Sequence, residues 1–363
     1  MLKSLIVILK IVLSPLSLLY TFVMWLRNKA FDRGIIRSMR FPMPVISVGN
    51  LSTGGTGKSP HIEYLIRLLS KEYQVATLSR GYRRRTKGFL MAKKQHTAYE
   101  LGDEPMQFAM KFPDAVVAVC EQRIIGMPMI MSERPDVEVI LLDDAFQHRS
   151  VVPGLNILLT DFQAPFYKDF VLPSGNLREW RSGYQRADMI IVSKCPPNLD
   201  MQQRAEIVRA IAPKPHQKVF FSTVRYGQMY EWQTGEPSVL SPDMHVLLLT
   251  GIAKPGPVEG HLQSMVKDVT LYSFPDHHYF TNKDLDGLHN RFLELGAKDV
   301  VIVTTEKDAA RLSVKREQLQ EWNLPIWILP IEIEFLSAKE EFEAQVKDFV
   351  GSTLEQYKRS QAN

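Results

Sequence analysis

The sequence is poor in cysteine, with only Cys120 and Cys195 among its 363 residues. Two cysteines so far apart form neither a metal-ligand motif nor a disulfide framework, and their scarcity fits a reducing compartment. Repeats at solenoid periods and long low-complexity tracts are also missing. With 45% hydrophobic and 23% charged residues, the composition is that of a folded globular protein. The length favours two domains.

The chain has no excess of basic residues outside its N-terminal part. Residues 1–40 hold seven basic residues and one acidic residue, which is more than the whole net charge of +4. This distribution argues against a nucleic-acid binder, whose basic residues should line a broad face of the fold. It favours a local contact of the N-terminus with anionic lipid head groups, such as an inner membrane surface.

Residues 5–26 form a long apolar stretch, interrupted by Lys10 and Pro15. Because a spanning helix needs about 20 apolar residues, three interpretations are open: an interfacial anchor, a full span and an ordinary buried helix. We expect a membrane-associated helix over residues 1–27. The basic residues that follow it place the next domain on the cytoplasmic face of the bacterial inner membrane.

From residue 41 onward, short β-branched runs alternate with helical periodicity, which predicts an α/β fold with a parallel sheet flanked by helices. We expect a nucleotide-binding domain over residues 28–215 and a β-hairpin linker over 216–244. A smaller α/β domain follows over 245–363, and its final helix could pack back on the first domain. The expected strands are 45–48, 75–78, 115–119, 137–142, 156–160, 188–192, 246–249, 269–274, 300–303 and 326–329.

A glycine-rich segment between the first of these strands and an amphipathic helix predicts a phosphate-binding loop, or P-loop. Gly54, Gly55 and Gly57 let backbone N–H groups turn toward an anion. Lys58 is expected to reach the β- and γ-phosphates of ATP, and Ser59 to ligate Mg²⁺. The loop residues expected to contact the nucleotide are Asn50, Ser52, Thr53, Gly54, Gly55, Thr56, Gly57, Lys58 and Ser59. The first glycine of the usual motif is replaced by Ser52.

Asp143 and Asp144 end a buried strand, at the edge of a parallel sheet where ligands bind. One of them is expected to hold Mg²⁺, although a helix N-cap would also explain an aspartate here. For the nearby His148, a structural and a catalytic role are equally open. Arg80-Gly-Tyr-Arg-Arg-Arg-Thr-Lys87 is either a solvated surface run or a site for phosphate or membrane head groups.

Segments in a fixed order resemble the tetraacyldisaccharide 4′-kinase family of the lipid A pathway. They are Val48–Pro60, Leu78–Tyr82, Gly102–Pro105, Leu142–His148, Leu172–Glu179, Phe274–His278 and Thr304–Asp308. The resemblance implies an enzyme that transfers the γ-phosphate of ATP to the 4′-hydroxyl of a tetraacyldisaccharide 1-phosphate and so forms lipid IVA. It implies Asp103 and His277 as a base dyad across a cleft between domains that close over substrate, with Asp276 beside them. From sequence alone, Asp103 is more simply an N-cap.

The resemblance also implies further contacts with the nucleotide and metal. It places Arg123, Arg178 and Glu179 near the nucleotide and acceptor. Gln147, from its place after the two aspartates, is expected to orient phosphate or metal-bound water, and Glu104 and Glu179 join the candidate Mg²⁺ ligands. No role is predicted for Thr304–Lys307. Two other functions are open: a membrane-anchored P-loop ATPase without a phosphoryl acceptor, and a soluble small-molecule kinase. Neither a nucleic-acid nor a protein partner is expected.

Overall fold

The computed structural model describes residues 2–296 and 299–362. The chain divides into two compact units. The first comprises residues 1–80, 114–224 and 333–363, and the second comprises residues 81–113 and 225–332. Grouping of residues 81–113 with the second unit was not among the expected domain boundaries.

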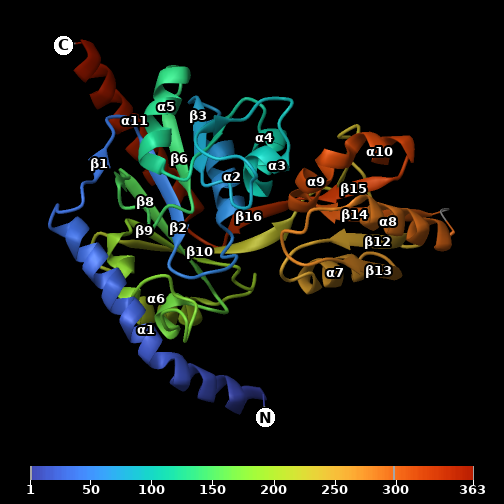
Figure 1. The fold of residues 1–363 in the computed structure, drawn as a ribbon, viewed down its shortest axis with the longest axis horizontal. Helices are drawn as coiled ribbons and strands as arrows, with labels where there is room; N and C mark the ends of the chain where they lie inside the picture. The colour runs from blue at the N-terminus through green and yellow to red at the C-terminus, as the bar shows by residue number, and fades with distance from the viewer. Residues whose placement is uncertain (1, 297–298, 363) are drawn as a thin grey trace. The chain divides into compact units, whose positions relative to one another are not determined.

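The first unit is built on a mainly parallel sheet with strand order β16-β10-β9-β8-β2-β6-β3-β5 (Figure 1). All of the described pairings from β10 to β5 are parallel. The strands are β2 (Val45–Asn50), β3 (Val75–Ser79), β5 (Val116–Val119), β6 (Val139–Asp143), β8 (Leu155–Asp161), β9 (Met189–Ser193), β10 (Lys218–Tyr226) and β16 (Ile331–Phe335). β1 (Met39–Arg40) and β7 (Val151–Val152) form a separate two-stranded sheet.

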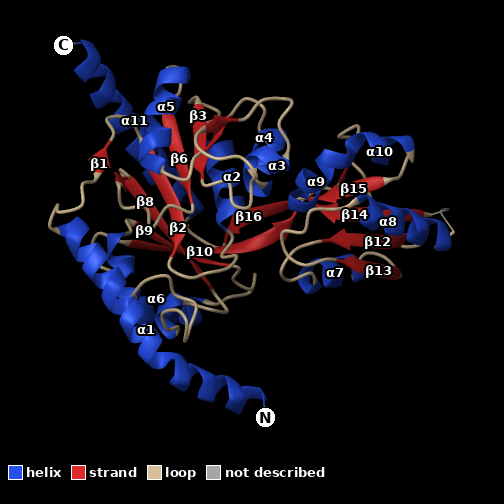
Figure 2. Cartoon of the chain, in the orientation of Figure 1, coloured by secondary structure: helices blue, strands red, loops and turns tan. Residues whose placement is uncertain are grey.

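Helices surround the strands of this sheet (Figure 2). They are α1 (Leu2–Asp32), α2 (Lys58–Leu69), α5 (Arg123–Glu133), α6 (Met201–Ile211) and α11 (Lys339–Ala362), with 3₁₀ turns at Phe166–Lys168 and Arg181–Arg186. Phe342 of α11 contacts the ring of Phe220 on β10, with centroids 5.3 Å apart. The final helix therefore belongs to the core of the first unit, as its fully buried Val346 and Val350 indicate.

The second unit has a five-stranded sheet with the order β11-β15-β14-β12-β13. Alternate residues of β12 enter two different apolar clusters, Leu247 and Leu249 on one side and Val246 and Leu248 on the other. Both faces of the sheet are therefore buried, as in other parallel α/β sheets. The strands of this sheet are β11 (Tyr230–Glu231), β12 (His245–Thr250), β13 (Asp268–Ser273), β14 (Val300–Thr305) and β15 (Ile326–Leu329). The unit also contains the short strand β4 (Leu90–Met91), which is not part of this sheet. The helices are α3 (Ala98–Leu101), α4 (Asp103–Lys111), α7 (Gly256–Gln263), α8 (Asn282–Glu294), α9 (Glu306–Leu312) and α10 (Arg316–Glu321), with a 3₁₀ turn at Ser313–Lys315.

The ten expected strands are all present, within two residues at either end. The expected β-hairpin in the linker is wrong, because β10 and β11 do not pair with each other in the described chain. β10 lies between β9 and β16, whereas β11 pairs antiparallel with β15. The local alternation of residues 219–232 predicts strands correctly, but it carries no information about their partners.

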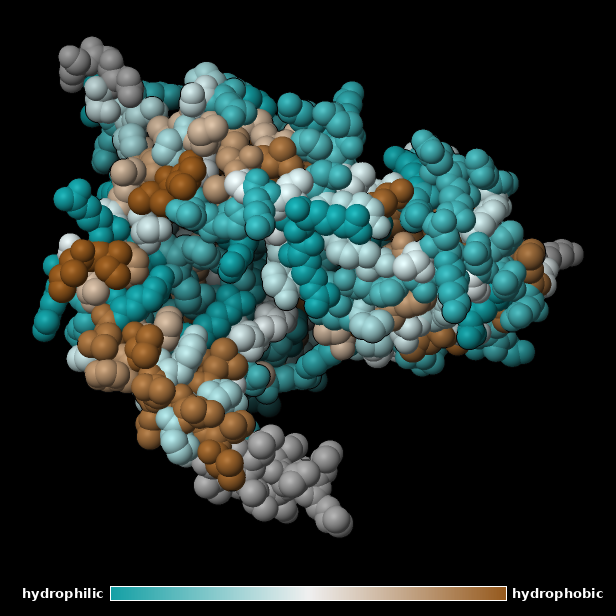
Figure 3. Space-filling model, viewed as in Figure 1, coloured by the Kyte–Doolittle hydropathy of each residue, from teal (hydrophilic) through white to brown (hydrophobic). Residues whose placement is uncertain are grey.

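The expectation of a membrane-anchoring N-terminal helix, and with it the expected location at the inner membrane, is also wrong. None of the helices in the described part of the chain is long and apolar enough to cross a membrane. One side of α1 is instead bonded to the first unit. Ser17 donates to the Ser174 hydroxyl at 2.8 Å, Tyr20 donates to the Arg178 carbonyl at 3.0 Å, and Arg27 donates to a carbonyl at 3.0 Å. Apolar side chains lie along the outer surface of the helix (Figure 3).

Candidate active site

The phosphate loop lies between β2 and α2 of the first unit, as the sequence predicts. Gly54 and Gly57 have φ angles of 97° and 83°, which are values that glycine adopts without strain. The Asn50 amide donates to the Thr56 hydroxyl at 2.9 Å, and the Ser193 hydroxyl donates to the Thr56 carbonyl at 2.8 Å. These bonds fix the loop, whose end at the N-terminus of α2 is suited to bind an anion.

Gly49 lies near the end of β2, ahead of the loop, where two backbone segments approach closely. A Cβ at this position would lie 2.7 Å from the Cβ and 2.8 Å from the amide nitrogen of Phe146. The glycine therefore allows β2 to approach the segment after Asp144. Downstream, the Thr53 N–H donates to the Asn176 carbonyl at 2.7 Å, so the loop also rests on the segment that carries Arg178.

Asp143 and Asp144 lie at the carboxyl end of β6, next to the phosphate loop. Asp144 accepts a hydrogen bond from Arg178 at 2.8 Å and lies 3.6 Å from the Lys58 ammonium. Burial opposes its ionisation, but Lys58 and Arg178 together hold the pKa of Asp144 below its ordinary value. Burial and the charge of Asp144 raise the pKa of Asp143 to about 6, and the Asp143 Oδ1 atom is buried without a hydrogen-bond partner.

Gln147 and Glu179 connect this site to α1. The Gln147 amide donates to the Asn50 carbonyl at 2.9 Å and to Glu179 at 3.0 Å. Glu179 is almost fully buried, and it also accepts from Arg186 at 2.7 Å and from Asn28 at 2.9 Å. Both residues are thus beside the phosphate loop, and Glu179 is engaged by three donors.

Arg123 begins α5 and is fully buried. Its two terminal nitrogens donate to the carbonyls of Cys120 and Asp143, each at 2.9 Å, which fixes the end of β6. Burial lowers the pKa of Arg123 to about 10. Burial likewise lowers the pKa of the neighbouring His148 to about 4, so this imidazole is neutral at physiological pH.

The second unit contains the expected pair of Asp103 and His277. His277 Nδ1 lies 2.6 Å from Asp103 Oδ2, and the Asp103 side chain is 3% exposed. Both residues belong to this one unit, so the pair forms inside it. Asp103 is the first residue of α4 and Gly102 is the N-cap, so the simpler interpretation of Asp103 as a capping residue does not apply.

The charges around Asp103 keep it ionised. Burial opposes this, but the hydrogen bonds with the side chains of His277 and Glu104, together with Lys307, hold the pKa of Asp103 well below its ordinary value. The pKa of Glu104 is raised to about 7 by burial and by the charge of Asp103. Asp276 is more exposed, with one oxygen 3.7 Å from His277 Nε2.

Lys307 is the residue of this cluster to which the sequence assigns no role. Its ammonium lies 3.0 Å from Glu104, 3.3 Å from His277 Nε2 and 3.7 Å from Asp103. Burial favours the neutral amine, but Glu104 and Asp103 hold the pKa of Lys307 above its ordinary value. Its position directly after β14, in the Thr304–Asp308 segment, was the signal that could have placed it at a site.

The basic run after Arg80 has defined contacts. Arg83 donates to the carbonyls of Asp276 at 3.2 Å and His277 at 3.4 Å. The Arg85 guanidinium lies over the Tyr99 ring, 3.8 Å from its centroid. Part of this run therefore supports the backbone at His277, which has the unusual φ angle of 60°.

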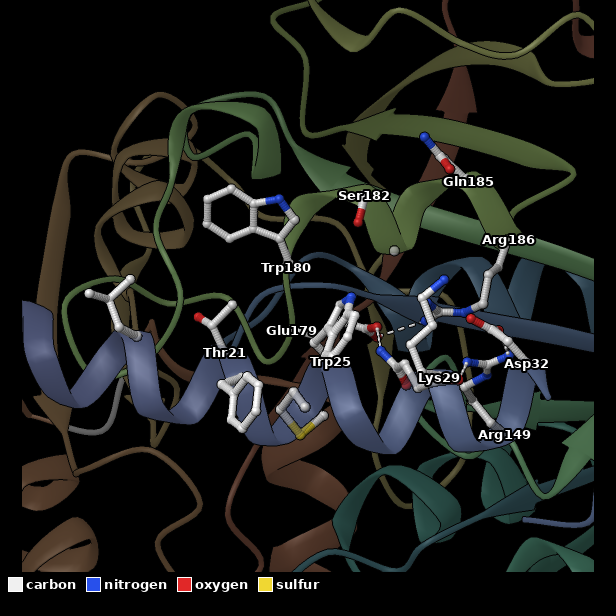
Figure 4. A pocket seen from close by; sticks show the side chains of 15 residues that line it. Thr21, Trp25, Lys29, Asp32, Arg149, Glu179, Trp180, Ser182, Gln185 and Arg186 are labelled. Carbon is white, nitrogen blue, oxygen red and sulfur yellow. Dashed lines mark hydrogen bonds and ion pairs between the residues drawn. The ribbon is translucent and has the colours of Figure 1, made fainter. Parts of the chain in front are cut away.

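A groove of about 640 Å³ lies between α1 and the segment that follows Glu179. Trp25 and Lys29 of α1 line it together with Trp180 and Arg186 (Figure 4). Trp25 is 51% exposed and Trp180 is 44% exposed. The groove thus presents large apolar surfaces beside cationic side chains, close to the Glu179 that contacts Gln147.

Together, the P-loop with Lys58, the carboxylates after β6 and the carboxylate–imidazole pair define a P-loop phosphotransferase. Comparison with known proteins gives the particular family. The family model described as tetraacyldisaccharide-1-P 4′-kinase matches residues 9–351, so this chain belongs to that family and is an enzyme, a kinase.

Individual relatives agree with this assignment. The tetraacyldisaccharide 4′-kinase of Phocaeicola vulgatus is 41% identical over 93% of this chain and 94% of its own. That of Flavobacterium psychrophilum is 45% identical, covering 94% and 97%. A crystal structure of LpxK from Aquifex aeolicus in complex with ATP is similar, with a TM-score of 0.73 and 28% identity over 94% of this chain and 99% of that one.

Proposed function

We propose that this chain carries out its family's reaction, ATP-dependent 4′-phosphorylation in lipid A synthesis, with Asp103 accepting the proton of the acceptor hydroxyl. The γ-phosphate of ATP would pass to the 4′-hydroxyl of a tetraacyldisaccharide 1-phosphate, which yields lipid IVA. The observation that carries this proposal is the 2.6 Å hydrogen bond between His277 and Asp103. A P-loop ATPase without an acceptor would have no use for such a pair.

The nucleotide is proposed to bind at the phosphate loop of the first unit. Backbone N–H groups from Gly54 to Gly57 and the start of α2 would surround the β- and γ-phosphates. Lys58 and Arg178 both contact Asp144 in this structure, and both are long enough to turn toward a phosphate. Their positive charge would stabilise the charge that develops on the transferring phosphoryl group.

The donors around β6 fit a magnesium ion. Mg²⁺ prefers oxygen ligands, and the buried Asp143 Oδ1 has no partner. Asp143, Asp144 and the Ser59 hydroxyl are the residues that would hold the ion. When bound, Mg²⁺ neutralises phosphate charge and orients the γ-phosphate. Glu179 is engaged by three donors and Glu104 by Lys307, so these two remain weaker candidates.

Asp103 is suited to the base role because it is ionised and oriented. Its carboxylate would accept a hydrogen bond from the 4′-hydroxyl and so orient that oxygen. As the new O–P bond forms and the bond to ADP breaks, the hydroxyl proton would pass to the Asp103–His277 pair. His277 stabilises the carboxylate in the orientation that this transfer requires.

The acylated part of the acceptor is proposed to bind in the groove beside α1. Its lining combines exposed tryptophan and phenylalanine rings with Lys29, Arg149 and Arg186. Apolar rings match acyl chains, while the cations match the anionic groups of a phosphorylated disaccharide. A water-soluble acceptor would have no use for this apolar surface, which argues against a soluble small-molecule kinase.

The direct test incubates purified protein with γ-labelled ATP, Mg²⁺ and either the acylated disaccharide 1-phosphate or water-soluble sugars. We expect label in the lipid alone. Lys58→Ala should weaken both ATP binding and transfer, because Lys58 is proposed to contact the phosphates. If label appears only as free phosphate, whether or not lipid is present, the proposed reaction is wrong.

A further inference from the structure

Lys307 occupies the centre of the cluster around His277. It is the second residue of α9, a helix capped by the Thr305 hydroxyl, which accepts from the Asp308 N–H. Its side chain is 23% exposed and extends to Glu104, Asp103 and His277. Every one of these residues lies in the second unit, so the arrangement is fixed inside a single packed body.

The contacts of His277 with Asp103 and with Lys307 both favour the same position of the imidazole proton. An ammonium group has three donors and no acceptor. Its nitrogen lies 3.3 Å from His277 Nε2, a contact in which Nε2 acts as the acceptor and the ring proton is on Nδ1. That proton then points to Asp103 Oδ2, 2.6 Å away. The three residues form one directed chain of donors, from Lys307 through His277 to Asp103.

A bound metal ion is a different way to organise the same groups. Ligand atoms of Asp103, Glu104 and His277 lie within 4.8 Å of one another. The Lys307 ammonium, however, is within 3.7 Å of all three. The cation at this point of the structure is therefore the protein's own.

The rest of the surroundings fix the plane of the imidazole but not its proton. The Tyr82 ring meets the imidazole edge-on with centroids 5.2 Å apart, and the His277 N–H donates to the Gly251 carbonyl at 3.2 Å. Neither contact distinguishes between the two neutral forms of the ring. Asp276, whose oxygen lies 3.7 Å from Nε2, would favour a proton on Nε2 if Lys307 were absent.

We propose that Lys307 is a positioning residue that holds His277 in the Nδ1–H form and thereby directs the ring proton to Asp103. The inference rests on the proposed function, because it assigns Lys307 to the base pair of that reaction. Without the ammonium, the ring proton can be on Nδ1, facing Asp103, or on Nε2, facing Asp276. The carboxylate of Asp103 is then held in its working orientation for only part of the time.

The first arm of the test does not need activity. The full chain is labelled with ¹⁵N-histidine, and the two ring signals of His277 are assigned by their loss in His277→Gln. In the wild type we expect one protonated and one unprotonated nitrogen, with the proton on Nδ1. Lys307→Met should give signals that report a mixture of both forms. Lys315→Met removes a partly exposed lysine of the same unit, bonded to Asn282, and should leave His277 unchanged.

The second arm measures transfer to the lipid acceptor. Lys307→Met should lower kcat by roughly 10- to 100-fold, as for a misplaced reacting group, with KM for ATP within about twofold. Lys307→Cys treated with 2-bromoethylamine regains an ammonium at nearly the same position, and kcat should rise again. Cys120 and Cys195 are both buried, so the treated wild type is the control for selective modification.

The outcomes separate the two proposals. If the wild type transfers no label to lipid, the proposed function fails, and the ring signals still decide the role of Lys307. If Lys307→Met leaves the His277 ring signals unchanged, the positioning role is overturned, even when kcat falls. The positioning role is also overturned if the Lys307 variants have a lower thermal midpoint and aminoethylation of Lys307→Cys restores stability but not turnover. Lys307 would then be only a structural ion-pair partner.

Discussion

Asp103 combines two properties that rarely occur together in a carboxylate, since it is almost completely buried and yet held in its charged form. The contacts from His277 and Lys307 explain this, because they replace the water that the group has lost. His277 contacts its Oδ2 atom, and the Glu104 N–H donates to its Oδ1 atom at 3.1 Å. An ionised carboxylate oxygen can accept a further hydrogen bond, so an incoming hydroxyl can still donate to it. This geometry leads to a direct prediction about catalysis.

Asp103→Asn should lower kcat by about 10²- to 10⁴-fold, because the amide cannot accept the hydroxyl proton. ATP binding should change less than about twofold, since the phosphate loop belongs to the other unit. Steady-state kinetics and calorimetric titration with a non-hydrolysable ATP analogue measure the two quantities. Asp286→Asn, at an exposed position of α8, is the control. A kcat near that of the wild type would remove Asp103 from the mechanism.

Gly49 offers a second prediction at the scale of one residue. In Gly49→Ala the new Cβ meets the backbone of Phe146 at 2.8 Å, so we expect a loss of about 1–3 kcal/mol in the free energy of unfolding. Gly55→Ala is the matched control, because a Cβ there has no neighbour within 4 Å. Urea unfolding of both variants provides the comparison, and equal midpoints would contradict this account of the loop.

At the scale of elements, His61 joins α2 to β10. Its Nδ1 atom lies 2.7 Å from the Gly57 carbonyl, and its Nε2 atom lies 3.1 Å from the Ser222 hydroxyl. The start of α2, which forms the anion site, is thereby bonded to a strand three places from β2 in the sheet order. Burial lowers the pKa of His61 to about 4, from an ordinary value of 6.5.

This lowered pKa makes the junction sensitive to acid. The unfolded chain binds a proton at His61 below pH 6.5, whereas the folded chain resists it until about pH 4. The stabilisation present above pH 6.5 is therefore lost as the pH falls through this window. Linkage gives a loss of about 2 kcal/mol between pH 7.5 and pH 5.

Denaturant unfolding of His61→Gln and the wild type at these two pH values tests the expectation. The variant should be less stable at pH 7.5 but should lose about 2 kcal/mol less on acidification. His216→Gln, at an exposed histidine, should follow the wild type. An identical loss in His61→Gln would show that the acid sensitivity resides in other groups.

At the scale of the whole molecule, the residues of the proposed function are divided between two units. The P-loop and the groove beside α1 belong to the first, and the Asp103–His277 pair with Lys307 belongs to the second. In the proposed reaction, the first unit binds ATP and the acyl chains, and the second unit provides the base. The groove beside α1 does not include the phosphate loop or the Asp103–His277 pair, so the proposed acceptor site can be tested by itself.

Trp25→Ala should raise KM for the acylated acceptor about tenfold, because a large apolar side chain contributes ~1.5–3 kcal/mol when it is fully covered and part of this is lost. KM for ATP should not change. Val23→Ala is the matched control, since Val23 is also about half exposed on α1 but does not line the groove. Equal acceptor KM values in the two variants would exclude the groove as the binding site for acyl chains.

The sequence alone determined much of the fold and of the first half of the site. Short runs of β-branched residues predict the strands, and the glycines between a strand and Lys58 predict the P-loop. The order of several such motifs also led to the correct family. These features are local, because backbone conformation and turn chemistry depend mainly on neighbours in the chain.

Only the tertiary structure decided which distant segments meet. It packed α1 onto the first unit through Ser17, Tyr20 and Arg27, where the apolar sequence had suggested an anchor in a membrane. It grouped residues 81–113 with the second unit, and it brought Lys307 to Asp103 across 204 positions of the chain. Such contacts depend on how whole helices and strands pack against one another. A local sequence pattern shows that an element has a face to bury, but it does not show which other element packs against that face.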